Sequence, residues 1–344
     1  MAATAVSQYY LSFHSIPEDG GTWRRRRRRT GSSVCCTPPV PSIPSSSPPP
    51  VVGPELSLSF GAHVIPHPKK VEKGGEDAFF ISSYNGGVVA VADGVSGWAE
   101  QNVNPALFSR ELMSKASSLV EDEEVSYNPR TLIQKAHAAT SSVGSATVII
   151  AMLEKNGTLK IASVGDCGLR VIRKGQVVFS TSPEEHYFDC PYQLSSEAVG
   201  QTYLDATVSS VELVKGDTLV IGSDGLFDNV FDHEIVSAVG TTSDGVTNTA
   251  KVLANLAHTH SLDLSYESPY SLEARARVIN WIQNFPSSSL FQHCSIDSLM
   301  TLILNYDLDQ QGFDVPWWKK MLGMKLTGGK LDDITVIVGH AESS

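Results

Sequence analysis

The sequence has no long apolar run. The longest, Thr147 to Leu153, is far shorter than the roughly 18 residues that a membrane-spanning helix requires, so we exclude an integral membrane protein. Cysteine is also scarce, because the 344 residues include only five, too scattered for a disulfide framework or a CxxC-type zinc site. These observations predict a protein of a reducing compartment without a transmembrane segment.

Basic residues are few outside one short block. All six in the first 54 residues form the run Arg24 to Arg29, and the rest of the chain has 20 basic and 35 acidic residues, a net charge of −15. Such a surface repels the phosphates of nucleic acids, so nucleic acid is excluded as a partner. The excess of carboxylates is instead compatible with a protein that binds cations.

Residues 1–54 have the composition of a targeting segment. They combine Ala, Ser and Thr at the start, the arginine block, few acids and a Ser/Pro-rich tract from Pro38 to Pro54, which cannot build a packed core. No apolar stretch follows a basic start, so a secretory signal is disfavoured and we predict an organellar transit peptide. The Met-Ala-Ala opening, hydroxylated residues and prolines favour the chloroplast, with the mitochondrion as the alternative. A disordered basic tail that binds anionic partners is the less favoured interpretation.

From Leu56 onward, short apolar runs alternate with turn residues. The runs 78–81 and 88–92 are joined by Asn85-Gly86-Gly87, which predicts a β-hairpin. Strands and helices together, with helices on the outer faces, predict an α+β layered fold with one large domain over 55–344. Further strands are predicted at 146–153, 159–164, 169–172 and 177–179, and helices at 105–119, 129–140, 233–239 and 246–258.

Aspartates fall at the ends of five predicted strands. Asp77 precedes one apolar run, Asp93, Asp166 and Asp224 each close one, and the pair Asp332-Asp333 opens the last. Carboxylates at the mouths of adjacent strands repel one another unless positive charge lies between them. Oxygen-only ligands select hard cations such as Mg²⁺ or Mn²⁺ over zinc. One Asp-Gly dipeptide is an ordinary turn signal, but five such positions together predict a site for divalent cations.

At these aspartates the chain resembles the type 2C (PPM) family of metal-dependent Ser/Thr protein phosphatases. The matching motifs occur in the family's order and cover nearly the whole predicted domain. They are Gly75-Glu76-Asp77-Ala78, Val91-Ala92-Asp93-Gly94, Gly144-Ser145-Ala146-Thr147, Val164-Gly165-Asp166, Gly222-Ser223-Asp224-Gly225-Leu226-Phe227-Asp228 and Asp332-Asp333-Ile334-Thr335. Two further pieces, Asp93 to Trp98 and Glu185 to Leu194, resemble the organellar Ptc7-like branch of the family.

The resemblance implies both a fold and a reaction. The fold is an α/β/β/α sandwich of two antiparallel sheets flanked by helices, with a two-metal centre at one end. The reaction is hydrolysis of phosphoserine and phosphothreonine in proteins by a metal-activated water, without a covalent phosphoenzyme. The cofactors are Mg²⁺ or Mn²⁺, two ions with a weaker third.

The resemblance also implies roles for individual residues. Asp93 would bridge two ions, the Gly94 carbonyl would bind one of them, and Asp224 and Asp332 would bind the other. The implied catalytic residues are therefore Asp93, Asp224 and Asp332. Glu76 and Asp77 would act largely through bound water, and Asp166 would share a third ion with Asp224.

Two positions depart from the family pattern. Many members have a phosphate-binding Arg four residues before the Glu of the Glu-Asp pair, and a His, taken as the leaving-group acid, after the first Asp-Gly. Here these positions are Glu72 and Val95. His186 is a candidate acid or substrate contact, although a structural histidine is the favoured interpretation. The preceding loop offers three lysines as phosphate contacts, each more simply interpreted as solvated: Lys69, Lys70 and Lys73.

The stretch from Val278 to Gln311 is interpreted as an insertion. In the plant relatives that the chain resembles, we expect the segment 268–270 to run almost directly into a piece like 312–316. The 34 residues keep the frame, valine codons begin with GT and Gln311 is compatible with CAG, which are the two intron borders. One hypothesis is therefore a translated, retained intron. The alternative is a genuine flap insertion before the last strand.

The leader and the resemblance together imply where the protein acts. They imply a chloroplast enzyme, stromal or thylakoid-associated, that acts on phosphorylated photosystem II core proteins. Trp317-Trp318 beside Lys319-Lys320 is a candidate for a membrane-surface contact, with burial of at least one ring as the alternative. Two other functions stay open: a catalytically inactive type 2C fold that serves as a binding module, motivated by Glu72 and Val95, and a hydrolase of small phosphoesters.

Overall fold

The computed structural model describes residues 56–197, 201–242, 244–284 and 327–343. All of them belong to one compact unit of the chain, which runs from Val51 to Ser344. The predicted transit peptide 1–54, the pair Trp317-Trp318 and most of the predicted insertion lie outside the described residues.

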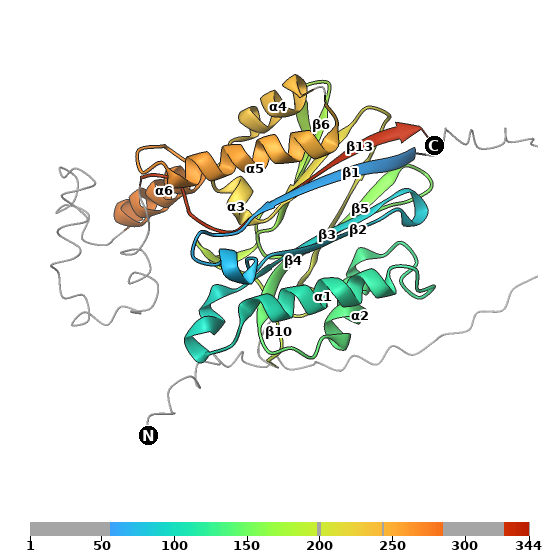
Figure 1. The fold of residues 1–344 in the computed structure, drawn as a ribbon, viewed down its shortest axis with the longest axis horizontal. Helices are drawn as coiled ribbons and strands as arrows, with labels where there is room; N and C mark the ends of the chain where they lie inside the picture. Colours follow the sequence, from blue (N-terminus) through green and yellow to red (C-terminus); the bar gives the residue numbers. More distant parts are fainter. Residues whose placement is uncertain (1–55, 198–200, 243, 285–326, 344) are drawn as a thin grey trace, which may run out of the picture. The chain divides into compact units, whose positions relative to one another are not determined.

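One sheet is built around the last strand of the chain. It has the strand order β1-β13-β12-β6-β7, and all its neighbouring strands are antiparallel. The chain therefore brings its first and last described strands side by side, as Figure 1 shows. The strands are β1 (Leu56–Ile65), β13 (Ile334–Ser343), β12 (Thr218–Gly222), β6 (Gly168–Arg173) and β7 (Gln176–Ser180).

The second sheet contains the predicted hairpins. Its order is β11-β5-β4-β3-β2, again antiparallel, with the short β10 (Leu194–Ser195) beside β4. A separate hairpin pairs β8 (Glu185–Tyr187) with β9 (Cys190–Pro191). The strands of the sheet are β11 (Thr207–Glu212), β5 (Thr158–Val164), β4 (Ser145–Leu153), β3 (Val88–Gly94) and β2 (Ala78–Ser82).

Helices form two outer layers. Helices α1 and α2 each begin with a proline whose preceding asparagine side chain accepts backbone N–H groups, a strong local start signal. They cover the second sheet, while α5 packs on the first through β1 and β13. The helices are α1 (Pro105–Leu119), α2 (Pro129–Ala139), α3 (Asp224–Phe227), α4 (Asp232–Thr241), α5 (Val246–Leu262) and α6 (Pro269–Asn284).

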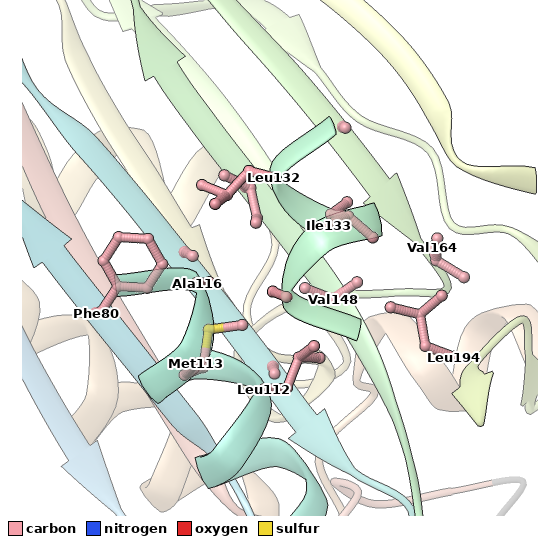
Figure 2. Packing of buried hydrophobic residues seen from close by; sticks show 14 of the residues in the cluster. Phe80, Leu112, Met113, Ala116, Leu132, Ile133, Val148, Val164 and Leu194 are labelled. Atoms are coloured by element: carbon pink, nitrogen blue, oxygen red, sulfur yellow. The ribbon is translucent and has the colours of Figure 1, made fainter. Parts of the chain in front are cut away.

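Three apolar layers hold this arrangement together. Strand β3 contributes to two of these layers. Its Val88 and Ala90 face the helices, whereas Val89 and Val91 face the other sheet, because successive side chains of a strand point to opposite faces. In Figure 2, Leu112 of α1 and Leu132 of α2 pack over the second sheet. A third cluster lies between the first sheet and helices α4 and α5. Burial on both faces explains why these strands are continuous apolar runs in the sequence.

The predicted fold class is confirmed. The structure is an α+β sandwich of two antiparallel sheets with flanking helices. The predicted helix 105–119 has the observed bounds, whereas the helix predicted over 246–258 continues to Leu262. Helix α6 and the β8–β9 hairpin were not predicted. Helix α6 runs through Val278, the expected start of the insertion, without an end there.

Candidate active site

The structure brings the five strand-end carboxylates together. Asp93 lies near the end of β3, Asp77 directly before β2, Asp166 between β5 and β6, Asp224 directly after β12 and Asp332 just before β13. Both sheets therefore contribute, and each of the other four carboxylates acts electrostatically on Asp93. Their convergence was the central prediction from the sequence.

Burial and mutual repulsion disfavour the charged forms of most of these carboxylates. Burial, followed by repulsion from Asp77 and the other three aspartates, raises the pKa of Asp93 well above its usual value. Burial is also the largest influence on Asp77, whose pKa rises to about 7, and on Asp332, whose pKa rises to about 6. Burial and the charge of Asp224 raise the pKa of Asp166 as well. Bound cations would relieve the repulsion within the cluster.

Two carboxylate oxygens of the cluster have no hydrogen-bond partner among the described residues. Asp77 Oδ2 accepts a hydrogen bond from Ser223 Oγ at 2.8 Å, and Asp224 Oδ2 accepts one from Lys330 Nζ at 2.6 Å. The other oxygen of each carboxylate, Oδ1, is buried with no hydrogen-bond partner in the described part of the protein. Buried polar atoms normally have partners, so these two oxygens are candidate ligands for a cation.

Lys70 inserts its ammonium group at one edge of the cluster. Its Nζ lies 2.6 Å from Glu76 Oε2, 3.1 Å from Asp333 Oδ2 and 3.7 Å from Asp332 Oδ1. Burial disfavours the charged form, but the hydrogen bond that Lys70 donates to Glu76 and the charges of the neighbouring carboxylates outweigh it and raise the pKa of Lys70. The interpretation of Lys70 as a solvated loop residue is therefore wrong, whereas Lys69 and Lys73 are exposed.

Lys330 enters the cluster beside Asp224 and Asp228. Its Nζ contacts Asp224 and Asp228 at 2.6 and 2.7 Å. Burial opposes the ionisation of Asp224, but the charge of Lys330 outweighs it and lowers the pKa of Asp224. The sequence prediction missed Lys330, and the only available signal was its position two residues before Asp332.

Asp333 holds the Glu76-Asp77 turn against β13. The carboxylate is 1% exposed and accepts hydrogen bonds from the backbone N–H groups of His67 and Glu76 at 2.7 and 3.0 Å. Arg110 of α1 supports the same turn by donating to the carbonyl of Gly75 at 2.9 Å. Asp333 is thus a positioning residue, and its signal in the sequence was the Asp-Asp pair itself.

Close backbone approaches explain two glycines of the motifs. A Cβ on Gly94 would lie 2.8 Å from the Pro105 carbonyl oxygen and 2.9 Å from that of Glu76. A Cβ on Gly225 would lie 2.0 Å from the Asp333 carbonyl oxygen. Neither position has space for a side chain, so both glycines are required for the packing of the strand ends.

Glu72 and Val95, the two residues that differ from the family pattern, lie outside the hydrogen bonds described for the cluster. Glu72 is exposed on a 3₁₀ turn (Val71–Lys73), and Val95 is half-buried after β3. His186 is exposed, with Nε2 3.0 Å from Gln201 Nε2 and its ring against Tyr192. These contacts favour the structural interpretation of His186.

A cavity of about 210 Å³ opens beside Asp224. Its walls come from the β8–β9 hairpin, from the start of α6 and from the cluster itself. It is smaller than the roughly 300–1,000 Å³ of sites that enclose a whole small molecule. Its residues include Asp166, Arg170, Phe188, Tyr270 and Lys330.

The donor set of the cluster fits Mg²⁺ or Mn²⁺. All its donors are oxygens, and two of them have no hydrogen-bond partner among the described residues. As they stand, no three His, Cys, Asp or Glu side chains of the described residues form a group that could hold an ion. The ammonium groups of Lys70 and Lys330 lie among the carboxylates instead. Ion binding would thus require carboxylate side chains to reorient.

Comparison with known proteins decides the family. No family model matches the chain. It is, however, 60% identical over 291 residues to "Probable protein phosphatase 2C 26" of Arabidopsis thaliana, across 85% of this chain and 86% of that protein. The chain belongs to the protein phosphatase 2C family. This protein phosphatase 2C is therefore an enzyme, a protein-serine/threonine phosphatase.

Two further relatives refine its place in the family. The X-ray structure of the photosystem II phosphatase PBCP is 59% identical, with a TM-score of 0.69, and the match covers 84% of this chain and all of that one. A PTC7 homologue of Drosophila grimshawi is 33% identical over 233 residues, 62% of this chain and 76% of the homologue. The resemblance of this protein phosphatase 2C to the Ptc7-like branch is confirmed.

Proposed function

We propose that this phosphatase hydrolyses phosphoserine and phosphothreonine with a water activated at a centre of two Mg²⁺ or Mn²⁺ ions. The observation that carries the proposal is the buried carboxylate cluster, with two unpartnered oxygens and raised pKa values. When bound, two such ions supply the charge that acidifies an attacking water and offsets the charge of the phosphoryl oxygens.

The residues of the cluster divide into ligands and supports. The residues that would hold the two ions are Glu76, Asp77, Asp93, Gly94, Asp224 and Asp332, of which Asp93, Asp224 and Asp332 are the catalytic set. Ser223 orients the Asp77 carboxylate, and Asp333 fixes the backbone of Glu76. Asp166 is the residue expected to share a weaker third ion with Asp224.

The nucleophile we propose is water. Of the two cysteines in the described residues, Cys167 is buried, and burial raises the pKa of its thiol well above the usual value. A thiol attacks only as its thiolate, so Cys167 is unsuited to a covalent mechanism. Cys190 lies in the β8–β9 hairpin, outside any glycine-rich turn.

The substrates we propose are phosphorylated photosystem II core proteins at the thylakoid. Support comes from the similarity to PBCP, whose structure is described as that of a photosystem II phosphatase. We further propose that residues 1–54 are a chloroplast transit peptide, with the mitochondrion as the alternative address. No helix in the described ranges has the length and apolar character needed to cross a bilayer.

We also propose that 55–344 is the phosphatase domain, with 278–311 as an insertion or retained intron. Deleting 278–311 should leave phosphatase activity and the thermal unfolding midpoint close to those of the full chain. Alignment of transcripts with the gene separates the two origins, since a continuous exon with no spliced counterpart would refute the intron.

Phosphopeptide hydrolysis tests the proposed reaction. The full chain should release phosphate with Mn²⁺ or Mg²⁺ but not with EDTA, and Asp93→Asn and Asp224→Asn should abolish release. Asp122→Asn, the same chemical change in the loop between α1 and α2, should keep wild-type activity. Competition between a phosphopeptide and a small phosphoester tests the class of substrate. A folded, metal-loaded wild type that releases no phosphate would instead support the binding-module alternative.

A further inference from the structure

The ammonium group of Lys330 is surrounded by carboxylates. Its Nζ lies 2.6 Å from Asp224 Oδ2, 2.7 Å from Asp228 Oδ2 and 3.4 Å from Asp189 Oδ1. These carboxylates come from the start and end of the α3 turn and from the β8–β9 hairpin. One charged group thus joins acidic side chains from two segments that are distant in the sequence, the β8–β9 hairpin and the α3 turn.

The backbone of Lys330 is held in place by a buried side chain. Asn229 is fully buried, and its Oδ1 accepts a hydrogen bond from Lys330 N at 2.9 Å. Its Nδ2 donates to the carbonyl oxygens of Lys330 and Gly225 at 2.7 and 2.9 Å. The Lys330 ammonium also lies 5.1 Å from the centre of the Tyr270 ring. This anchoring directs the lysine toward the carboxylates rather than toward solvent.

The region around the Lys330 ammonium was expected from the sequence to hold a third metal ion. That ion would bind between Asp166 and Asp224, and both of these residues line the cavity into which Lys330 also projects. Lys330 already occupies one oxygen of Asp224, the ligand that such an ion needs. A divalent ion at this point would lie next to the ammonium group, and the two like charges would repel each other.

We propose that the Lys330 ammonium takes the place of the third divalent cation, so that this phosphatase binds two metal ions and carries its third positive charge covalently. The inference rests on the proposed two-ion centre. Because the charge belongs to the chain, neither chelation nor dilution removes it. Asp166 then balances this charge and is not a metal ligand.

Counting bound Mn²⁺ tests the assignment. The full chain and its variants are dialysed to equilibrium against excess Mn²⁺, and bound ions are measured by elemental analysis. Wild type and Lys330→Arg should bind two ions per chain, because both keep the positive charge. Lys330→Gln should bind three, and Asp166→Asn added to Lys330→Gln should return the number to two.

Each other outcome overturns the assignment. Three ions in the wild type, or only two in a folded Lys330→Gln protein, would show that the ammonium does not replace an ion. If Lys330→Gln fails to fold by circular dichroism, Asp166→Asn alone decides: two ions support the assignment and one ion refutes it. Fewer than two ions in the wild type would refute the two-ion centre as well, so the two failures are distinguishable.

Discussion

Replacing Asp77 by asparagine should stabilise the metal-free protein at neutral pH while impairing its function. The Asp77 carboxylate is 8% exposed, and one of its oxygens has no partner among the described residues. Burial, with repulsion from Asp333 and Asp332, raises its pKa from the usual 3.8 to about 7. Asparagine has nearly the same shape, can still accept the hydrogen bond from Ser223, and carries no charge.

The pKa shift fixes the sign and size of the effect. Because the folded protein holds this proton more tightly than the unfolded chain, stability falls as the pH rises from about 4 to about 7. Each pKa unit corresponds to about 1.4 kcal/mol. Between pH 5 and pH 8 the ionisation of Asp77 should therefore cost about 3 kcal/mol. Asp77→Asn does not ionise and should lose that part of the pH dependence.

Urea unfolding in EDTA at pH 5 and pH 8 measures the difference. The free energy of unfolding should fall between the two pH values by about 3 kcal/mol less in Asp77→Asn than in wild type. Asp122→Asn should keep the wild-type pH dependence. Added Mn²⁺ should stabilise the wild type at pH 8. An Asp77→Asn protein with the wild-type pH dependence, or one less stable than wild type at pH 8, would refute the reasoning.

Three further substitutions test the packing around the site. Gly225→Ala should lower both the thermal unfolding midpoint and phosphatase activity, because its Cβ would lie 2.0 Å from the Asp333 carbonyl oxygen; unchanged values would contradict the close approach. Arg173→Met leaves the fully buried Asp217 without its ion-pair partner and should cost about 3–5 kcal/mol in urea unfolding. Phe108→Ala removes a fully buried ring from the inner face of α1 and should lower the free energy of unfolding by a similar amount, about 3–5 kcal/mol. Phe108→Leu should lower it by less than about 1.5 kcal/mol.

Local sequence signals predicted most of the secondary structure. Pro105 after Asn104 fixed the start of α1, and the Asn-Gly turn at Asn85-Gly86 fixed the hairpin of β2 and β3. Each signal acts through the dihedral angles or capping of a few neighbouring residues, so no tertiary contact is needed to recognise it. Helix α6 has the same kind of start signal, because Pro269 follows Ser268, whose Oγ accepts a hydrogen bond from Ser271 N at 3.1 Å, but the sequence prediction missed it. The short β8–β9 pair lacks such a signal.

Within the site, the carboxylates were predictable and their partners were not. Asp93 and Asp224 were identified because each ends an apolar run before a glycine, a pattern confined to a few adjacent residues. Lys70, Lys330 and Asp333 give no such pattern. A lysine in a polar loop has the same local sequence whether it projects into solvent or into a cluster of acids.

The sequence by itself determined most of the strands, the helices α1, α2, α4 and α5 and the positions of the acidic strand ends, because alternation, capping and turn chemistry act over a few residues. Only the tertiary structure decided that these ends meet, that Asp333 locks the Glu76 turn, and that two lysines lie among the carboxylates. The physical reason is the separation along the chain of the residues that interact. Hydrogen bonds such as that from Lys330 to Asp224 join residues 106 positions apart, and they form only when β12 and β13 have paired in the first sheet.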